Sequence, residues 1–432
     1  MNERTEDHSD RVCVIGAGPA GIAAGKHLHR AGLRFDMVDA NPGFGGLWNW
    51  REDSSPAYSS THLITSKTVT AFPDFPMPAS YPDFPHADLV RAYLASYAEH
   101  CGLGGAEFAT RVLEVRRTDR GGSGWIVRAG HPDGEWTRDY RAVLVCAGHL
   151  SAPRLPEIPG AFTGEQFHSI AYKTPGILEG KRVLVVGAGN TGCDIAVEAG
   201  RVGAFAALSM RRGYHYVPKY LFGRPIDIAV PLPLSLRRRR PIDRLLLRLA
   251  VGDPSRLGIP KPDHRLYERI PIVSSELLYS LGHGRIVVRP EIARLDGGRV
   301  HFTDGTAEPY DLLVYATGYR ASLGFLPDGL VRFAGHKPDL FMNIFPRDAE
   351  DIAMIGLTEV PAGGWEVEDV QAELAVRSLA SSLRGEPASA RFGAVARRPE
   401  PDLSGGLDLC DPLHYDTAPF LRHMRRLIAT FP

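Results

Sequence analysis

Two segments of the chain share one pattern, in which a short apolar strand leads into a glycine-rich turn and then a helix. The glycines of the first turn are Gly16, Gly18 and Gly21, and those of the second are Gly187, Gly189 and Gly192. In such a turn the first glycine permits the bend, the second lets the backbone approach a pyrophosphate, and the third allows close helix packing. Free amides at the helix N-terminus favour phosphate. We therefore predict two dinucleotide-binding units.

The second strand of each unit ends in a different kind of side chain. Asp39 follows the first glycine, Gly16, by 39 − 16 = 23 residues, and Arg211 follows Gly187 by 211 − 187 = 24 residues. A carboxylate at this place accepts hydrogen bonds from a free ribose diol, whereas arginines suit a 2′-phosphate. The first unit is therefore interpreted as an FAD site, and the second, with Arg211 and Arg212, as an NADPH site.

The order of the predicted elements indicates an α/β fold with two Rossmann-like domains, each carrying a small antiparallel β meander. The buried strand 141–146 ends in Cys-Ala147-Gly148, and the strand 311–316 ends in Ala-Thr317-Gly318. These similar strands flank the second glycine unit and predict that it is inserted into the first domain. The expected boundaries are 1–155 for the first part of the FAD domain, 156–312 for the NADPH domain and 313–432 for the remainder.

Several segments outside the glycine units carry weaker signals. The second meander is expected to include strands at 286–288 and 299–302, and the tail from Gly385 carries no clear pattern. A basic run, 237–240, precedes an amphipathic helix, 242–250. A solvated helix face is the first interpretation of that helix, with a membrane surface or a protein partner as the alternatives.

Composition excludes several classes of protein. Lys+Arg and Asp+Glu are both 50 in 432 residues, so the formal net charge is +0, which argues against nucleic acid as a partner. The five cysteines form no CxxC pair, so we expect no metal site and a reducing compartment. We expect no signal peptide at the polar N-terminus. No apolar run reaches the ~18 residues of a membrane span. We expect a soluble, cytoplasmic protein; a homodimer is left open.

Taken together, these motifs resemble the flavin-containing monooxygenases. The most specific match is the linker before the second glycine turn, Phe162-x-Gly164-x-x-x-His168-x-x-x-Tyr172-Lys173, where Baeyer–Villiger monooxygenases more often have a tryptophan at the Tyr172-Lys173 position. Further matches are Gly45-Gly46-Leu47-Trp48 and Phe72-Pro-Asp-Phe-Pro76. The linker is interpreted as structural, helping to orient the two domains, rather than as catalytic.

The resemblance implies the cofactors, the reaction and the residues involved. NADPH would reduce FAD, and the reduced flavin would react with O2 to give a C4a-hydroperoxide that oxygenates an amine nitrogen or a sulfur of a small molecule. The expected cofactor-binding residues are Gly16, Gly18, Pro19, Ala20, Gly21, Asp39, Gly46, Leu47, Trp48, Ala147, Gly148, Gly187, Gly189, Asn190, Thr191, Gly192, Arg211, Arg212, Thr317 and Gly318.

The chain departs from the family pattern at one point. The family usually places an asparagine beside the flavin about eight residues before the FPDFP-like segment, and this chain has Ile64 there, followed by Thr65 and Ser66. These three residues are the expected flavin-facing loop. The alternative functions are Baeyer–Villiger oxidation or oxidative decarboxylation of a carbonyl compound, an NADPH–flavin reductase without oxygenation, and a flavin-bound sensor or scaffold.

Overall fold

The protein, represented by a computed structural model, is described at residues 5–118, 124–230, 234–335 and 337–432. It divides into two compact units. The first consists of Met1–Glu52, Lys67–Ser151 and Ala321–Pro432, and the second of Asp53–Ser66 and Ala152–Arg320. Each unit is described separately below.

The first unit is built on a six-stranded mixed sheet with the order β2-β1-β5-β4-β3, and β25 pairs with β5. Strands β1 (Glu6–Ile15), β2 (Phe35–Val38), β5 (Gly134–Val145) and β25 (Ile352–Met354) run parallel. Strands β3 (Arg111–Arg117) and β4 (Trp125–His131) continue from β5 as an antiparallel meander. The end of β1 is fully apolar and buried, as a strand between parallel neighbours requires.

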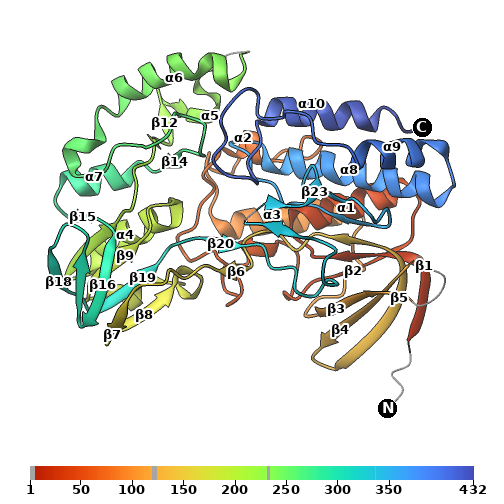
Figure 1. Cartoon of the computed structure of the whole chain (residues 1–432), viewed down its shortest axis with the longest axis horizontal. Helices are drawn as coiled ribbons and strands as arrows, with labels where there is room; N and C mark the ends of the chain where they lie inside the picture. The colour runs from red at the N-terminus through yellow and green to blue at the C-terminus, as the bar shows by residue number, and fades with distance from the viewer. Residues whose placement is uncertain (1–4, 119–123, 231–233, 336) are drawn as a thin grey trace. The chain divides into compact units, whose positions relative to one another are not determined.

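Helix α1 (Pro19–Arg30) packs against α8 (Gly364–Leu383), and α8 packs against α9 (Pro387–Ala396) and α10 (Thr417–Ile428) (Figure 1). Helix α3 (Ala87–His100) also contacts α1. The aromatic–proline segment after α2 (Lys67–Thr70) is ordered because its rings are buried: Phe72 stacks on Tyr97 and on Trp365 of α8. The remaining elements of this unit are η1 (Gly46–Trp48), β21 (Phe333–Ala334), β22 (Lys337–Pro338), β23 (Leu340–Phe341) and β24 (Phe345–Pro346).

The second unit contains a parallel five-stranded sheet with the order β15-β10-β9-β19-β8. Its strands are β8 (Glu165–His168), β9 (Arg182–Val186), β10 (Phe205–Ser209), β15 (Val287–Arg289) and β19 (Leu312–Tyr315). Helix α4 (Asn190–Val202) packs on β9 and β10 and contacts α7 (Glu276–Gly282). Apolar residues of these elements share one buried cluster that includes Val185, Ile195 and Leu208.

A second sheet in this unit has the order β18-β17-β16-β7. Strands β16 (Ile292–Gly297), β17 (Arg299–Phe302) and β18 (Ala307–Pro309) form the meander, and β7 (Gly160–Phe162) joins β16 in parallel. The remaining elements are β6 (Ala152–Pro153), β20 (Tyr319–Arg320), β11 (Tyr216–Val217), β14 (Ile272–Val273), β12 (Tyr220–Leu221), β13 (Arg224–Pro225), α5 (Ile226–Ala229), α6 (Leu236–Ala250), η2 (Ser169–Ala171), η3 (Pro175–Leu178) and η4 (Pro254–Leu257).

Two expectations need correction, and one segment without a clear pattern proves to be helical. Strand β15 does not belong to the second meander, because it pairs in parallel with β10 at the edge of the main sheet. The segment without a clear pattern, the tail from Gly385, forms α9 and α10, whose apolar residues pack against α8. Asp53–Ser66, expected in the first domain, groups with the second unit, where the Lys173 ammonium donates to the Ser55 carbonyl at 2.6 Å.

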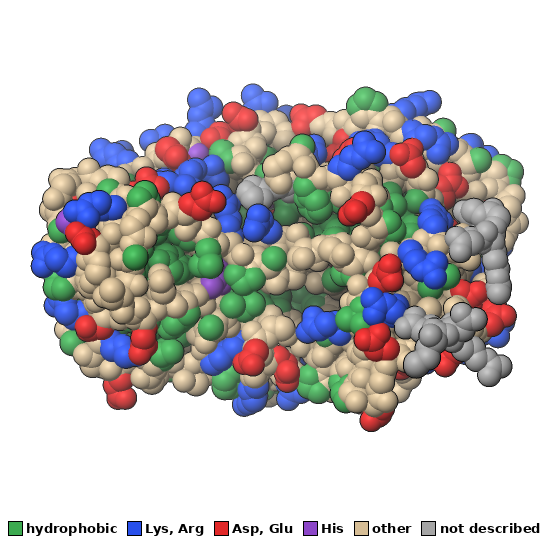
Figure 2. All heavy atoms as spheres, turned by 60° about the horizontal axis from the view of Figure 1, so that its bottom comes forward, with side chains coloured by type: hydrophobic (Ala, Val, Ile, Leu, Met, Phe, Trp, Pro, Cys, Tyr) green, Lys and Arg blue, Asp and Glu red, His purple; other side chains and the backbone are tan. Residues whose placement is uncertain are grey.

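The surface agrees with the balanced composition. Figure 2 shows Lys, Arg, Asp and Glu side chains interspersed on the face that it presents, without a large field of one sign. In the described part of the chain, no helix is long and apolar enough to cross a membrane.

Candidate dinucleotide-binding sites

The first glycine turn is fixed by close backbone contacts within the first unit. Gly16 has a φ of +112°, and a Cβ there would lie 2.4 Å from the carbonyl oxygen of Cys146 at the end of β5. A Cβ on Gly21 would lie 1.9 Å from the carbonyl oxygen of Gly16. No side chain fits at either position, so both glycines are required by the protein itself.

Gly18, between them, has no such internal requirement. Its φ is −77°, and a Cβ there would approach its nearest neighbour, the Gly46 Cα, at an ordinary 3.5 Å. It caps α1 without a side-chain hydrogen bond, and the first turn of α1 contains no acid. The turn thus presents uncapped amides and space beside them, a fit for the pyrophosphate of a dinucleotide.

Asp39 lies at the end of β2, where the sequence predicts it, and holds the turn in place. Its Oδ2 accepts a hydrogen bond from the Ala17 amide at 2.6 Å, and its Oδ1 accepts one from the Asn41 amide at 2.7 Å. Burial raises the pKa of Asp39, and the two amides oppose that rise. Each carboxylate oxygen keeps a second lone pair for a ribose hydroxyl.

The Gly45–Trp48 segment meets the same turn, as expected from its glycines. The Gly45 amide donates to the Ala17 carbonyl at 3.2 Å, and a Cβ on Gly46 would lie 3.0 Å from the Gly18 Cα. Leu47 is partly exposed, and the ring of Trp48 meets Trp365 edge to face. Ala147 and Gly148 follow β5 directly beside this turn, and Gly148 has a φ of +71°.

The second glycine turn repeats this geometry within the second unit. Gly187 has a φ of +105°, with a would-be Cβ 2.5 Å from the Ala316 carbonyl oxygen, and a Cβ on Gly192 would lie 1.9 Å from the Gly187 carbonyl oxygen. Gly189 has a φ of −71° and no atom within 4 Å of its would-be Cβ. Helix α4 again has no side-chain cap and no acid in its first turn. This turn also fits a pyrophosphate.

Other predicted residues of this turn have structural partners. The Asn190 Oδ1 accepts a hydrogen bond from the Val273 amide at 3.0 Å, which ties α4 to β14. The Thr317 hydroxyl donates to the Arg154 carbonyl. The Gly318 carbonyl accepts from the Arg154 amide and from His168 Nε2, each at 3.0 Å. Thr191 lies in the first turn of α4 and is partly exposed.

Arg211 and Arg212 follow β10, at the edge of the sheet where the second glycine turn lies. Arg211 is exposed and makes no ion pair with any described residue, whereas Arg212 Nη1 lies 3.7 Å from Asp263 Oδ2. A free guanidinium and a weakly paired one are therefore available for an anionic group in this unit.

The linker motif packs inside the second unit. His168 Nε2 lies 3.0 Å from the Gly318 carbonyl, and its Nδ1 lies 3.2 Å from the Ile170 amide, so the neutral ring donates through Nε2 and accepts through Nδ1. Burial lowers the pKa of His168 and favours that neutral form. Phe162 is buried in the meander, and a Cβ on Gly164 would lie 2.7 Å from the Asp311 carbonyl oxygen.

Two acids on α4 were missed by the sequence analysis. Glu198 Oε2 accepts the hydroxyl of buried Tyr172, and Asp194 Oδ2 accepts that of Tyr58 at 2.8 Å. Burial raises the pKa of Asp194 to about 6. The signal in the sequence was an acid pair four residues apart on a helix face that otherwise packs inward.

The Ile64–Ser66 segment lies in the second unit. Ile64 is 38% exposed, whereas Ser66 is buried and its amide donates to Asp227 Oδ2 at 2.6 Å. Its place beside a flavin stays a prediction. The next residue, Lys67, donates to the carbonyls of Pro78 and Ala79, at 3.2 and 2.9 Å.

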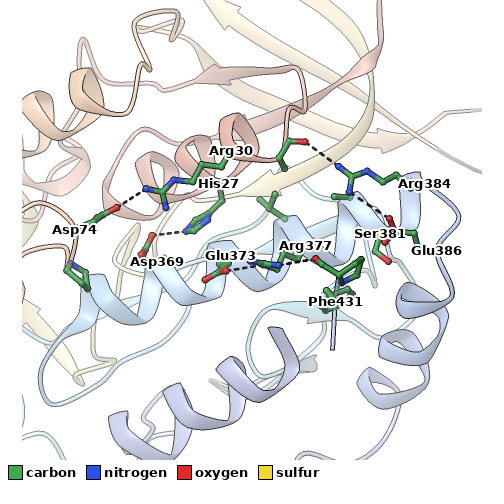
Figure 3. A pocket seen from close by; sticks show the side chains of 15 residues that line it. His27, Arg30, Asp74, Asp369, Glu373, Arg377, Ser381, Arg384, Glu386 and Phe431 are labelled. Carbon is green, nitrogen blue, oxygen red and sulfur yellow. Dashed lines mark hydrogen bonds and ion pairs between the residues drawn. The ribbon is translucent and has the colours of Figure 1, made fainter. Parts of the chain in front are cut away.

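A cavity of about 530 Å³ in the first unit lies away from the glycine turn. It is lined by the C-terminal part of α1, by α8 and by the last residues of the chain (Figure 3). Its charged groups pair with one another: Arg30 with Asp74 at 3.1 Å, and Arg377 with Glu373 at 2.9 Å. Because those charges are matched, the cavity offers little to a charged ligand.

In each unit, parallel strands lead into a GxGxxG turn and a helix, which is the arrangement of a Rossmann-type domain. Residues 9–401 match the model of the FMO-like, or flavin-binding monooxygenase-like, family. The chain is 32% identical over 412 residues to rat dimethylaniline monooxygenase (N-oxide-forming) 2, covering 90% of this chain and 77% of that protein. It is 30% identical over 445 residues to human flavin-containing monooxygenase 1, covering 98% and 84%. The chain belongs to the flavin-binding monooxygenase-like family, whose members are oxidoreductases, and membership implies FAD and NADPH.

Solved structures share the fold. A flavin-containing monooxygenase from Stenotrophomonas maltophilia matches with a TM-score of 0.66 at 24% identity, covering 87% of this chain and 99% of that chain. Cyclohexanone monooxygenase with bound ε-caprolactone matches with a TM-score of 0.72 at 20% identity, covering 98% of each chain. The fold is thus common to monooxygenases that carry different names.

Proposed function

We propose that this protein uses NADPH and O2 to oxygenate an amine nitrogen or a sulfur of a small molecule, with FAD in the first unit and NADPH in the second. One observation carries the cofactor assignment. In each unit a glycine, Gly18 or Gly189, has room beside it at the N-terminus of a helix that has no side-chain cap. The strand that follows the first of these helices ends at a carboxylate, whereas the strand that follows the second ends at arginines. Two equivalent cradles with opposite charges suit two different dinucleotides.

In the first unit, Gly18 and the amides of α1 would hold the pyrophosphate of FAD, and Asp39 would accept from its ribose. Gly46 and Leu47 adjoin the turn and would border the cofactor. Bound flavin supplies hydride acceptance and activation of O2. The protein supplies position and exclusion of water, a division of work typical of cofactor enzymes.

In the second unit, Gly189 and the amides of α4 would hold the pyrophosphate of NADPH. Arg211, which makes no ion pair among the described residues, would bind the 2′-phosphate, and Arg212 would assist. Linker residue His168 forms its hydrogen bonds with backbone groups, packs its ring edge to face against Tyr319 and has a lowered pKa, as a packed, neutral ring would. We therefore assign the linker a structural role within this unit.

The substrate class is supported by the curated relatives. The rat relative is named for N-oxide formation. Soft nucleophiles such as amines and sulfides need no protein base to be oxygenated, and the sequence contains no recognisable catalytic triad. Baeyer–Villiger oxidation is the second candidate, because the fold also matches cyclohexanone monooxygenase.

The test is a substrate screen with complete stoichiometry. Tertiary amines, sulfides and ketones would be compared for NADPH consumed, O2 consumed, hydrogen peroxide released and product formed. We expect close to one N-oxide or sulfoxide per NADPH, with one oxygen atom of the product derived from labelled O2. Esters or lactones formed from ketones would favour the second candidate. Peroxide equal to the NADPH consumed with every substrate would contradict both and indicate a reductase.

A further inference from the structure

The loop between η4 and β14 lies against the residues that follow β10 in the second unit. A Cβ on Gly213 would lie 1.9 Å from the carbonyl oxygen of Pro260, so the two backbones touch where Gly213 has no side chain. His215 Nε2 lies 3.0 Å from the carbonyl oxygen of His264 and donates to it. The loop is therefore fixed directly beside the two arginines at the end of β10.

Asp263 in this loop is held in place by the next residue. His264 Nδ1 lies 2.8 Å from Asp263 Oδ1 and donates to it. The His264 side chain is only 4% exposed, and its ring meets the rings of Tyr214 and His215 edge to face. The hydrogen bond from His264 and the charge of Arg212 lower the pKa of Asp263, so this acid is an anion at neutral pH.

The Asp263 carboxylate faces Arg212, one of the two arginines assigned to the coenzyme. Arg212 Nη1 lies 3.7 Å from Asp263 Oδ2, and the two side chains are 28% and 54% exposed. That distance brings the charges together but is longer than a hydrogen bond, so the pair does not fix the guanidinium in one orientation. Asp263 therefore offsets part of the charge of Arg212 without positioning its side chain.

We propose that Asp263 competes with the 2′-phosphate of NADPH for Arg212 and thereby limits how strongly the second unit prefers NADPH to NADH. The 2′-phosphate is an anion, as Asp263 is, so its binding at Arg212 breaks the ion pair and brings like charges together. NADH has a hydroxyl group at this place and meets no such repulsion, and specificity is the difference between the two affinities. This inference rests on the proposed assignment of the second glycine turn to NADPH.

Two other roles for Asp263 predict different results. A carboxylate that oriented Arg212 for the phosphate would strengthen NADPH binding, but such support is usually given by short, two-point hydrogen bonds, which this pair lacks. A solvated ion pair without any role would leave the affinity unchanged. Only competition predicts that removal of the Asp263 charge tightens NADPH binding.

The test is calorimetric titration of the full FAD-loaded protein with NADP+ and with NAD+. Asp263→Asn removes the charge and keeps the size of the side chain. We expect it to bind NADP+ about three- to fivefold more tightly than the wild type, near the upper limit for an exposed ion pair, with the NAD+ affinity unchanged. The gain should shrink as NaCl rises, because salt screens exposed charges. Unchanged or weaker NADP+ binding would overturn the proposal.

A double-mutant cycle shows whether the competition is for Arg212. Arg212→Ala should weaken NADP+ binding more in the Asp263→Asn protein than in the wild type, with the two losses differing by about threefold or more. Equal losses in the two proteins would overturn the proposal, because Asp263 would then act independently of Arg212.

The matched control is Asp296→Asn. Asp296 is an exposed acid of β16 in the same unit and pairs with Arg294 at 2.9 Å, so this variant should bind NADP+ as the wild type does. A gain in NADP+ affinity equal to that of Asp263→Asn would overturn the proposal, because the overall charge of the unit would then explain both.

Failure of the proposed function would give a different result. The probe is 2′,5′-ADP, which carries the 2′-phosphate without the nicotinamide. A wild-type protein that binds neither NADP+ nor 2′,5′-ADP would overturn the NADPH assignment and this inference with it. NADP+ binding by the wild type that Asp263→Asn leaves unchanged would overturn only the role of Asp263.

Discussion

A Cβ atom on Gly187 would lie 2.5 Å from the carbonyl oxygen of Ala316. The first unit repeats this relationship between Gly16 and Cys146, at 2.4 Å. In both turns the first glycine is locked against the end of the neighbouring parallel strand, while the middle glycine has ordinary φ and tolerable space. The GxGxxG motif therefore combines two glycines that the fold requires with a middle glycine that the fold itself does not require.

This division predicts opposite outcomes for two substitutions in the second turn. Gly187→Ala should lower the free energy of unfolding by about 2 kcal/mol or more, because it combines a strained φ with a backbone clash. Gly189→Ala should change it by less than about 1 kcal/mol, yet weaken NADP+ binding at least tenfold, because the methyl group fills the cradle. Denaturant unfolding and calorimetric titration would measure the two effects. Tight NADP+ binding by Gly189→Ala would remove this turn from the cofactor site.

Cofactor choice is predicted to depend on Arg211. Arg211→Ala should raise the Michaelis constant for NADPH at least tenfold and leave that for NADH nearly unchanged, since only NADPH carries the 2′-phosphate that a guanidinium would bind. Arg201→Ala is the matched control, because Arg201 is an exposed arginine of the same unit that pairs with Glu276. An equal loss for both coenzymes would rule out the 2′-phosphate assignment.

The stability of the second unit should depend on pH through His168. Burial lowers the pKa of this ring, so the unfolded chain, with a pKa of about 6.5, binds a proton first as pH falls. The contribution of neutral His168 to the free energy of unfolding is therefore fully present above about pH 6.5. It declines as the pH falls from that value through the folded-state pKa. His168→Gln should flatten the difference between pH 7 and pH 5 relative to the wild type. An identical pH profile of urea unfolding in both proteins would contradict this.

Glu368 should make the stability of the first unit depend on pH in the direction opposite to that expected for His168. Its Oε2 is buried without a hydrogen-bond partner among the described residues, and burial raises the pKa of its carboxyl group to about 7. The folded state thus keeps a proton that the unfolded chain releases near pH 4.3, and stability is lost as pH rises between these values. Glu368→Gln should be more stable than the wild type by up to about 3 kcal/mol at pH 8, with no gain at pH 4.

Glu366→Gln provides the comparison, because Glu366 is a partly exposed acid of the same helix paired with Arg425 at 2.6 Å. Its stability difference from the wild type should stay within about 1 kcal/mol at pH 8. If Glu368→Gln gave no larger gain than this control at pH 8, Glu368 would be ionised in the folded state.

The glycine turns and their strands could be predicted because they obey local rules. Gly16, Asp39 and Gly187 lie at their predicted places, since strand, turn and helix follow one another within about 25 residues. The predicted helix Ala87–His100 is confirmed as α3. Family membership, predicted from the linker residues Phe162 to Tyr172 and the glycine turns, is also confirmed, since residues 9–401 match the family model.

Other features depended on contacts distant in sequence. The sequence pattern of Val287–Arg289 predicts a short strand but not the sheet to which it belongs. Only its pairing with β10 assigns it to the parallel sheet. Helices α9 and α10 gain stability from packing on α8 rather than from a strong local pattern. Asp194 and Glu198 are ordinary acids in sequence, and their importance comes from the tyrosines that reach them from elsewhere in the unit.

Asp53–Ser66 also has a consequence for the order of events during synthesis. Ser55 emerges from the ribosome 118 residues before Lys173, the side chain that binds its carbonyl oxygen. At about 5–20 residues per second, this early segment waits on the order of 6 to 24 seconds for its partner. The second unit therefore cannot finish folding until both of its segments have been synthesised. An excised fragment that begins at Ala152 would lack the Asp53–Ser66 segment, which is synthesised much earlier.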